Sequence, residues 1–402
     1  MNQPVNQPIN RTVNWTQQLQ RRTPLGWLQL SRHKGRLFVA LAGIAFADVL
    51  IFMQLGFQGA LFESNTRIRA NLDADVVLVS PKAKNTQNLS TFARRRLYQA
   101  KDIPGVASAQ GLYSGTLTWK NPETRQDTQL QVMGFDPDHP AFNIPEMNQQ
   151  LDKVKLPEVV LFDRKARGDY DQTFAQVSQG KWVETETENR TISIRGLYSL
   201  GASFGTDGLL ITSDQNFLRF FPRRDPGSLS LGLINLEPEA DPDQVVAALR
   251  AHLPEDVDVV TMAKFIEDEK QYWQKESPIG FIFSLGAGMA FVVGVVIVYQ
   301  VLSTDVNAHL KEYATFKAMG YRQTYLLGVV FEEAIILALL GFIPGTILPI
   351  GLYFFAAKAT SLPIYMTVAR AITVFLLTVI MCMLSGAIAT RKLQSADPAD
   401  MF

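Results

Sequence analysis

The sequence offers few groups that could perform catalysis. The segment GASFG at residues 201–205 matches the G-x-S-x-G pattern, in which a serine on a strand-to-helix turn acts as a nucleophile. That chemistry also needs an acid and a histidine, and only His252 and His309 lie downstream. Because the segment lies between two strand-like runs, we predict an ordinary glycine-rich turn in preference to a hydrolase site.

Metal, phosphate and redox chemistry are not indicated either. The four histidines are scattered, without the spacing of metal ligands, so we expect no metal site. No G-x-x-x-x-G-K-[ST] motif is present to cradle a phosphate, so this chain is expected to bind no ATP or magnesium and to have no enzymatic activity. Cys382 is the single cysteine, which excludes a disulfide or a cysteine-based metal site within one chain.

The more informative ionisable residues lie inside long apolar stretches, where a charge is costly unless it is paired or hydrated. Asp48 lies near the middle of the first stretch. It could be a proton or coupling site, or a protonated or hydrogen-bonded residue that packs against another helix or a second copy. No second buried carboxylate or base completes a relay, so we favour packing. Glu332 and Glu333 lie near the start of a later stretch; we expect one to reach the interface and the other to pair with Arg322 or a partner chain.

Four apolar stretches are predicted to be transmembrane helices, at residues 37–62, 278–302, 326–357 and 371–389. At about 1.5 Å per residue the first exceeds a bilayer core of roughly 30 Å, so it should protrude from the membrane. It is also too long, and too far from residue 1, for a cleavable signal peptide. Pro344, in the sequence GFIPG, should break or kink the third helix.

The distribution of basic residues predicts the orientation. Residues 1–36 contain six Lys and Arg and no acid, so they should stay in the cytosol. Four crossings then return residues 390–402 to the cytosol and place residues 303–325 there as well. Residues 63–277, which contain 31 Asp and Glu against 25 Lys and Arg, should lie outside; we call them the outer domain.

The cytosolic N-terminal segment divides into two parts. Residues 1–20 are rich in Asn and Gln and are expected to be disordered. The following residues have Thr23 as a helix N-cap and Pro24 in the first turn. Together with Trp27 and several basic residues, they predict an interfacial helix on the inner leaflet.

The outer domain has the sequence pattern of an α+β fold. Two strand–helix–strand units, at residues 75–119 and 228–262, predict a split βαβ sandwich of ferredoxin-like type. Residues 120–227 would then be an inserted β-rich subdomain. Helix-forming segments at both ends of the domain should form a stalk that continues the first two membrane helices.

A short charged segment joins the second and third apolar stretches. It predicts an amphipathic helix in which Val306, Leu310, Tyr313 and Phe316 form an apolar stripe, with Lys311, Glu312 and Thr315 opposite. Gly320 should provide a left-handed C-terminal cap, and Lys317 suits the helix dipole. We expect the stripe to fill a groove in a partner, with Phe316 as anchor; the alternative is a plain connecting helix. The candidate coupling residues are Leu310, Lys311, Glu312, Tyr313, Phe316, Lys317, Ala318, Met319 and Gly320.

Several segments resemble one protein family. EYATFKAMG, at residues 312–320, resembles the E-x-A-x-x-K/R-A-x-G element of FtsX/MacB-type ABC permeases. FEEAIILALLGFIPG and ATRKLQSADPADMF are similar to that family's third span and tail, and the order of one span, a large outer domain and three spans fits the whole chain. AGIAFADVLIFMQLGFQGALF and GASFGTDGLLITSDQNFLRFF are most similar to the DevC-like permeases of cyanobacteria.

The resemblance implies a homodimer in the bacterial inner membrane with a periplasmic outer domain. A cytosolic ATPase subunit, which binds ATP and magnesium, would dock on residues 303–322. A periplasmic membrane-fusion adaptor and a TolC-like outer-membrane channel would complete a tripartite exporter, with membrane lipids as contacts and no nucleic acid. Motion driven by the ATPase would reach the outer domain, and DevC-like members are associated with glycolipid export. The alternatives are a lipoprotein-releasing permease and a cell-division-type FtsX permease that activates a periplasmic partner.

Overall fold

The computed structural model describes residues 25–32, 34–188 and 190–395. The predictions for residues 1–20, Thr23 and Pro24 lie outside this range, as do residues 396–402 of the tail. The chain divides into two compact units. The first comprises the described residues up to Ile51, Gly288–Leu348, and those from Val368 onward; the second comprises Phe52–Ala287 and Pro349–Thr367.

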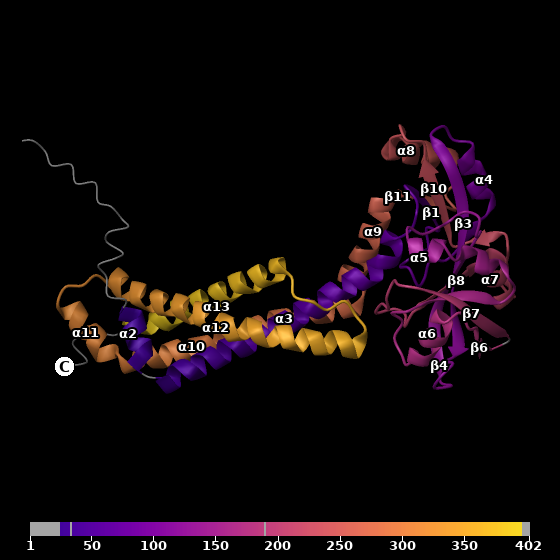
Figure 1. Cartoon of the computed structure of the whole chain (residues 1–402). Helices are drawn as coiled ribbons and strands as arrows, with labels where there is room; N and C mark the ends of the chain where they lie inside the picture. The colour runs from indigo at the N-terminus through magenta and orange to yellow at the C-terminus, as the bar shows by residue number, and fades with distance from the viewer. Residues whose placement is uncertain (1–24, 33, 189, 396–402) are drawn as a thin grey trace, which may run out of the picture. The chain divides into compact units, whose positions relative to one another are not determined.

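Within the described residues, four helices are long and apolar enough to cross a membrane. They are α3 (Lys34–Ala70), α10 (Pro278–Ala308), α12 (Gln323–Thr360) and α13 (Val368–Ser395). Each extends beyond the apolar stretch that predicted it, because the polar residues at its ends continue the same helix. Figure 1 draws α3 as one ribbon from the apolar segment into the predicted stalk segment. The class of α-helical membrane protein with four spans is confirmed.

The first unit is a helix bundle to which the short helix α2 (Leu25–Arg32) adds Leu30. Small residues allow its helices to approach closely, as is common in membranes. A Cβ atom built on Gly43 would lie 2.4 Å from Ile297, and one on Gly294 would lie 2.8 Å from Ala47. The buried core consists of Leu30, Ala40, Ile44, Ala47, Val298, Leu302, Ala334, Leu337, Ala338, Met381, Cys382 and Ala389.

The GFIPG segment does not interrupt α12, contrary to the expected break. The glycines instead make room for α3. A Cβ atom on Gly341 would lie 2.6 Å from Ile44, and one on Gly345 would lie 2.8 Å from the Cβ of Asp48. A proline leaves one backbone carbonyl of its helix without a hydrogen bond. In a membrane, neighbouring helices can satisfy that carbonyl, so a proline-containing segment can remain helical.

The second unit contains the predicted split βαβ sandwich. One half is β1 (Val76–Val79), α4 (Arg95–Lys101) and β3 (Val106–Lys120). The other is β10 (Leu231–Leu236), α8 (Pro242–His252) and β11 (Asp258–Thr261). These strands have the order β11-β1-β10-β3, with antiparallel neighbours. Leu97 of α4 and Leu249 of α8 belong to one apolar core with the sheet. The ferredoxin-like prediction is therefore confirmed.

Residues 120–227 do not form a sheet of their own, as a separate subdomain would. Between residues 76 and 261, with residue 189 left out, the strands extend one nine-stranded sheet in the order β11-β1-β10-β3-β4-β8-β5-β7-β6. The cause is the length of β3: its first half pairs with β10 and its second half with β4, and Leu112 has a partner in both. The added strands are β4 (Asp127–Phe135), β5 (Val159–Asp163), β6 (Val183–Glu186), β7 (Thr191–Tyr198) and β8 (Leu209–Ser213).

Short helices and one small ribbon complete this unit. The helices are α5 (Pro145–Asn148), a 3-10 turn (Leu151–Lys155), α6 (Asp171–Ser178) and α7 (Asp214–Phe220). Strands β2 (Phe92–Ala93) and β9 (Ser228–Leu229) pair with each other. After β11, α9 (Met262–Gln271) and a π-helical turn (Tyr272–Glu276) lead to α10.

Candidate functional site

The predicted coupling helix is α11 (Leu310–Ala318), which follows α10 after the single residue His309. Gly320 has a positive φ of 88°, a conformation that glycine adopts without strain. The amide of Gly320 donates to the carbonyl of Lys317, and that of Tyr321 donates to the carbonyl of Phe316. These two bonds form the Schellman motif that ends many helices, so the predicted glycine cap is confirmed.

The apolar stripe of α11 packs within the chain. Val306 and Tyr313 are buried against Leu326 and Val330 of α12, with Leu310 and Phe316 partly buried beside them. Phe316 is only half-buried in this contact, and the expectation that it anchors a partner's groove stays a prediction. Only four residues separate α11 from α12, and this short turn folds the stripe onto the first turns of α12.

The opposite face of α11 is open to solvent. Lys311, Glu312 and Thr315 are exposed there, as the helical pattern predicts. Beyond the helix end, 60% of the Met319 side chain is exposed, a large fraction for an apolar residue. Lys317 is half-buried, and the side chain of Ala318 lies outside the described part of the structure. A partner can thus reach the charged face of α11 and Met319.

Next to α11 lies a buried acidic pair. Glu333 of α12 is fully buried, and the Asp305 carboxyl of α10 is close enough to interact with it electrostatically. Among the described residues neither oxygen of Glu333 has a hydrogen-bond donor. His309, which precedes α11, has its Nδ1 atom 3.5 Å from a carboxylate oxygen of Asp305. The sequence predicted Arg322 or a partner chain as the partner of one of these glutamates. Arg322 is exposed in the structure. The proximity of Asp305 and His309 was not predicted, although their i,i+4 spacing was an available signal.

Glu332 and Asp48 have different surroundings. Glu332 is half-buried, in keeping with a side chain that reaches toward the interface. Asp48 is fully buried, and its Oδ1 atom accepts a hydrogen bond of 2.6 Å from the Thr378 hydroxyl of α13. Asp48 also lies against Gly345 of α12. The aspartate therefore lies where three helices meet, an arrangement that suits the packing role.

A second cluster, which we call the stalk clamp, lies in the second unit. Arg69, near the end of α3, makes a buried ion pair with Glu269 of α9 at 2.6 Å. The guanidinium also donates to the carbonyl of Phe265 and to the Thr86 hydroxyl, and it stacks on the Phe265 ring. Glu269 accepts a further bond of 2.8 Å from the Trp273 indole. These contacts hold α3 and α9 side by side, as the stalk prediction requires.

Glu269 has an unusual electrostatic environment. Burial raises the pKa of its carboxyl above the ordinary glutamate value, while Arg69, Trp273 and Thr86 act to lower it. Burial is the largest of these effects, so the carboxylate depends on its partners to stay ionised. The sequence could not identify this clamp, since its two charged residues lie 200 positions apart (269 − 69).

The GASFG segment has a structural role. The Ser203 hydroxyl accepts hydrogen bonds from the amides of Gly205 and Thr206, which closes a turn before strand β8, so the serine is not on a strand-to-helix turn. The Ser203 carbonyl and the Asp207 carboxylate both bind Arg167. Arg167 in turn donates a hydrogen bond of 2.9 Å to the carbonyl of Thr360, the last residue of α12. The turn thus presents an arginine that caps the end of a membrane helix.

The residues that the structure describes contain no group of three or more His, Cys, Asp or Glu placed to hold a metal ion. The fold and these contacts define a membrane protein with four spans and a large mixed-sheet domain. Residues 37–252, more than half of the chain, match the family model of the MacB-like periplasmic core domain, and residues 284–398 match that of the FtsX-like permease C-terminal region. The chain belongs to the family of FtsX/MacB-type ABC-transporter permeases.

Other comparisons concern the outer domain. The periplasmic region of MacB from Actinobacillus actinomycetemcomitans matches with 10% identity over 50% of this chain and 94% of that one, at a TM-score of 0.33. The extracellular domain of the noncanonic ABC-type transporter YknZ from Gram-positive bacteria matches with 14% identity over 47% of this chain and 100% of that one, at a TM-score of 0.31. No curated protein matches the sequence.

Proposed function

We propose that this permease is the membrane subunit of an ATP-driven exporter that transmits motion of a cytosolic ATPase to the periplasmic domain. The observation that carries the proposal is the pair of contacts made by α12. At its start, Leu326 and Val330 pack against α11. At its end, the carbonyl of Thr360 is bound by Arg167 of the outer domain. Because α12 is one helix between these points, a displacement of α11 has a direct path along it.

A second path follows α3, which is also one helix and ends in the stalk clamp. Arg69 and Glu269 bind each other there with almost no exposed surface, so the end of α3 cannot move without α9. In this proposal both termini are cytosolic, as the basic N-terminal segment favours. ATP and magnesium are bound by the partner, because this chain has no phosphate-binding loop.

The ATPase would contact the exposed face of α11. Met319 offers an apolar anchor, and Lys311 and Glu312 offer charges that fix the register at the rim. The family resemblance is the basis for the remainder of the proposed assembly, a homodimer with a periplasmic adaptor and a TolC-like channel. It is also the basis for proposing a lipid or glycolipid substrate. The spans contain few charges, which argues against a polar channel and favours entry of the substrate from the periplasm or the outer leaflet.

The first test addresses docking of the ATPase. Met319→Asp should weaken association of the full chain with its co-purifying ATPase by about 10- to 100-fold, because a buried anchor commonly contributes roughly 1–3 kcal/mol. Tyr98→Asp is the matched control, since Tyr98 is a large residue with 61% exposure on α4 of the outer domain. Binding is measured in detergent. Equal affinity of the Met319 variant and the control would remove α11 as the docking site.

The second test addresses transmission. Arg167→Met should leave ATPase binding intact and abolish the ATP-dependent change in protease sensitivity of the outer domain, since the methionine cannot bind the Thr360 carbonyl. Arg190→Met is the control, because Arg190 makes an exposed ion pair with Glu158 at 2.9 Å. An unchanged response in the Arg167 variant would show that α12 does not carry the motion. Isolation of the ATPase complex with a periplasmic adaptor would favour the tripartite exporter over the lipoprotein-releasing and cell-division alternatives.

A further inference from the structure

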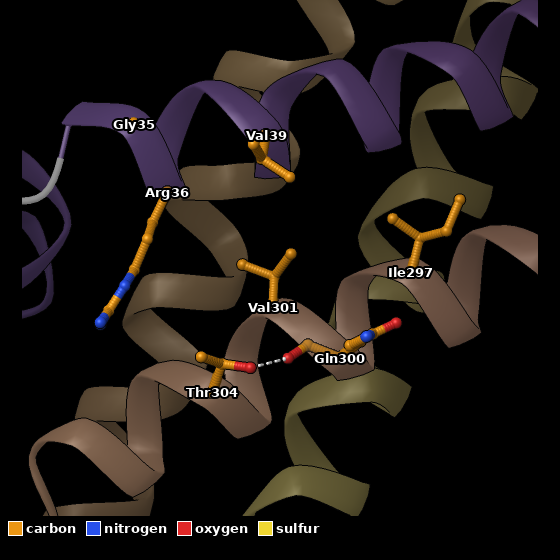
Figure 2. A pocket seen from close by; sticks show the side chains of 7 residues that line it. All are labelled: Gly35, Arg36, Val39, Ile297, Gln300, Val301 and Thr304. Carbon is orange, nitrogen blue, oxygen red and sulfur yellow. Dashed lines mark hydrogen bonds between the residues drawn. The ribbon is translucent and has the colours of Figure 1, made fainter.

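A groove lies between the first turns of α3 and the last turns of α10, within the first unit. It encloses about 390 Å³. Figure 2 shows Arg36 and Thr304 toward one end of the groove, Ile297 at the other, and Val39 and Val301 between them. The full lining is Gly35, Arg36, Val39, Ile297, Gln300, Val301 and Thr304, of which none is acidic.

Two glycines explain why the groove exists. At Gly43 the helices touch, because a Cβ atom there would lie 2.4 Å from Ile297. Two turns earlier, at Gly35, a Cβ atom would meet nothing within 4 Å. The helices therefore separate from Gly43 toward the start of α3, and the space between them is open to the outside of the bundle.

The lining changes in polarity along the groove. On α10, Ile297, Val301 and Thr304 follow the i, i+4, i+7 spacing of one helix face and cover about 10 Å. The Thr304 hydroxyl donates to the Gln300 carbonyl at 2.7 Å, which fixes its rotamer, while the Gln300 side chain is exposed. On α3, Arg36 precedes Val39 by one turn. The Arg36 cation and the Thr304 hydroxyl thus lie toward one end of the groove, and Val39, Val301 and Ile297 line the rest, with the Gln300 amide extending toward Ile297.

We propose that this groove binds one acidic phospholipid of the cytosolic leaflet. Arg36 would bind the phosphate, since its planar guanidinium matches two phosphate oxygens, and Thr304 would bind the headgroup. One acyl chain would lie along Val39, Val301 and Ile297. An acidic headgroup is favoured over a zwitterionic one because the lining offers no anion to a choline group. A second copy seated groove to groove would bring two Arg36 side chains together, which disfavours it as the occupant.

The leaflet assignment rests on the proposed topology, and lipid binding itself is tested in the absence of a membrane. The full chain in mild detergent is titrated with phosphatidylglycerol or phosphatidylcholine, and the bound lipids are counted by native mass spectrometry. We expect one phosphatidylglycerol per chain and weaker binding of phosphatidylcholine. Arg36→Gln should weaken binding of phosphatidylglycerol by at least about fivefold, the effect of one basic residue at a lipid surface. Lys34→Gln is the matched control, because Lys34 is exposed in the same turn and does not line the groove.

A second pair of variants tests the shape of the groove without altering charge. Gly35→Leu should fill the groove and prevent binding, whereas Gly288→Leu should not; a Cβ atom at either position meets nothing within 4 Å, so both variants should fold. Equal losses from Arg36→Gln and Lys34→Gln, equal binding of the two lipids, or normal binding by Gly35→Leu would each overturn the proposal. So would a disulfide between two chains formed through cysteines at positions 39 and 300, which would identify a second copy as the occupant.

The topology has its own readout. A Lys311→Cys chain with Cys382 replaced by Ser should be labelled only after the membrane is permeabilised. Labelling from outside would refute the proposed orientation and the assignment to the cytosolic leaflet. It would not affect the test of lipid selectivity, which is made in detergent.

Discussion

The stalk clamp gives a sharp prediction about stability. Arg69→Met removes the guanidinium and keeps most of the aliphatic side chain. In the parent, the side chains of Arg69 and Glu269 are only 4% and 0% exposed, so the pair is almost fully removed from water. The variant leaves the Glu269 carboxylate with the Trp273 indole and the Thr86 amide as its only partners in the described structure.

The size of the effect follows from burial. Removal of one partner from a buried ion pair costs about 3–5 kcal/mol, since the remaining charge stays out of water. For a domain of about 150–250 residues, each kcal/mol lowers the melting temperature by roughly 2–4 °C. We therefore expect the outer domain of Arg69→Met to melt about 6–20 °C below the parent. The double variant Arg69→Met/Glu269→Leu should recover most of this loss, because it buries no unpaired charge.

The assay is thermal unfolding of the full chain in detergent, followed by tryptophan fluorescence and by protease resistance of the outer domain. Lys264→Met is the control. Lys264 pairs with Asp268 on the same helix, α9, but these side chains are 54% and 40% exposed, and exposed pairs contribute about 0–1 kcal/mol. A melting temperature for Arg69→Met within about 2 °C of the parent would refute the argument from burial. A double variant as unstable as the single one would instead assign the loss to the stacking of Arg69 on Phe265.

Two further predictions concern single carboxylates. The guanidinium of Arg96 donates a hydrogen bond of 2.8 Å to Asp256 and holds the pKa of that carboxyl below its usual range. A carboxyl with a lowered pKa stabilises the fold at pH values above its pKa in the unfolded chain, near 3.9. This stabilisation is lost as the pH falls through the pKa in the folded chain. Asp256→Asn should thus be slightly less stable than the parent at pH 7, with a difference that shrinks below about pH 4 in thermal unfolding; a constant difference would contradict this assignment. Asp48→Asn should insert and support ATP-driven activity like the parent, because its amide oxygen can still accept from Thr378, whereas a normally assembled but inactive variant would mean that Asp48 is a coupling site.

The membrane class and the split βαβ core could be predicted because both depend on local patterns. A long apolar stretch has few alternatives to a membrane helix, and strand–helix–strand order restricts the sheet topology strongly. The single nine-stranded sheet could not be predicted in the same way. It depends on the two halves of β3 pairing with different strands, and a long extended segment is compatible with either one sheet or two.

The coupling helix α11 shows a different limit of prediction from the sequence. The periodicity of Leu310, Tyr313 and Phe316 predicts that one face of α11 is buried, and that face is indeed covered. Periodicity does not say what covers it. The answer here is α12, the next helix in the chain, so the surface left for a partner is the opposite one. The stalk clamp and the Arg167 cap join residues far apart in the sequence, and no local pattern marks them.

The proposed transmission requires α12 to move relative to α3, and the contact between these helices is suited to such movement. Gly341 faces Ile44 and Gly345 faces Asp48, so the glycines are one turn apart on α12 and their neighbours are one turn apart on α3. A glycine surface has no side chain to interlock with the neighbouring helix. The two helices can therefore slide past each other here without unpacking interlocked side chains. Asp48 accepts a hydrogen bond from Thr378 of α13, so α3 is held on its other side, while at Gly341 and Gly345 α12 has no side chain that interlocks with α3. The sequence predicts that the GFIPG segment breaks or kinks the third helix; in the structure this segment provides a glycine-lined face on a continuous helix.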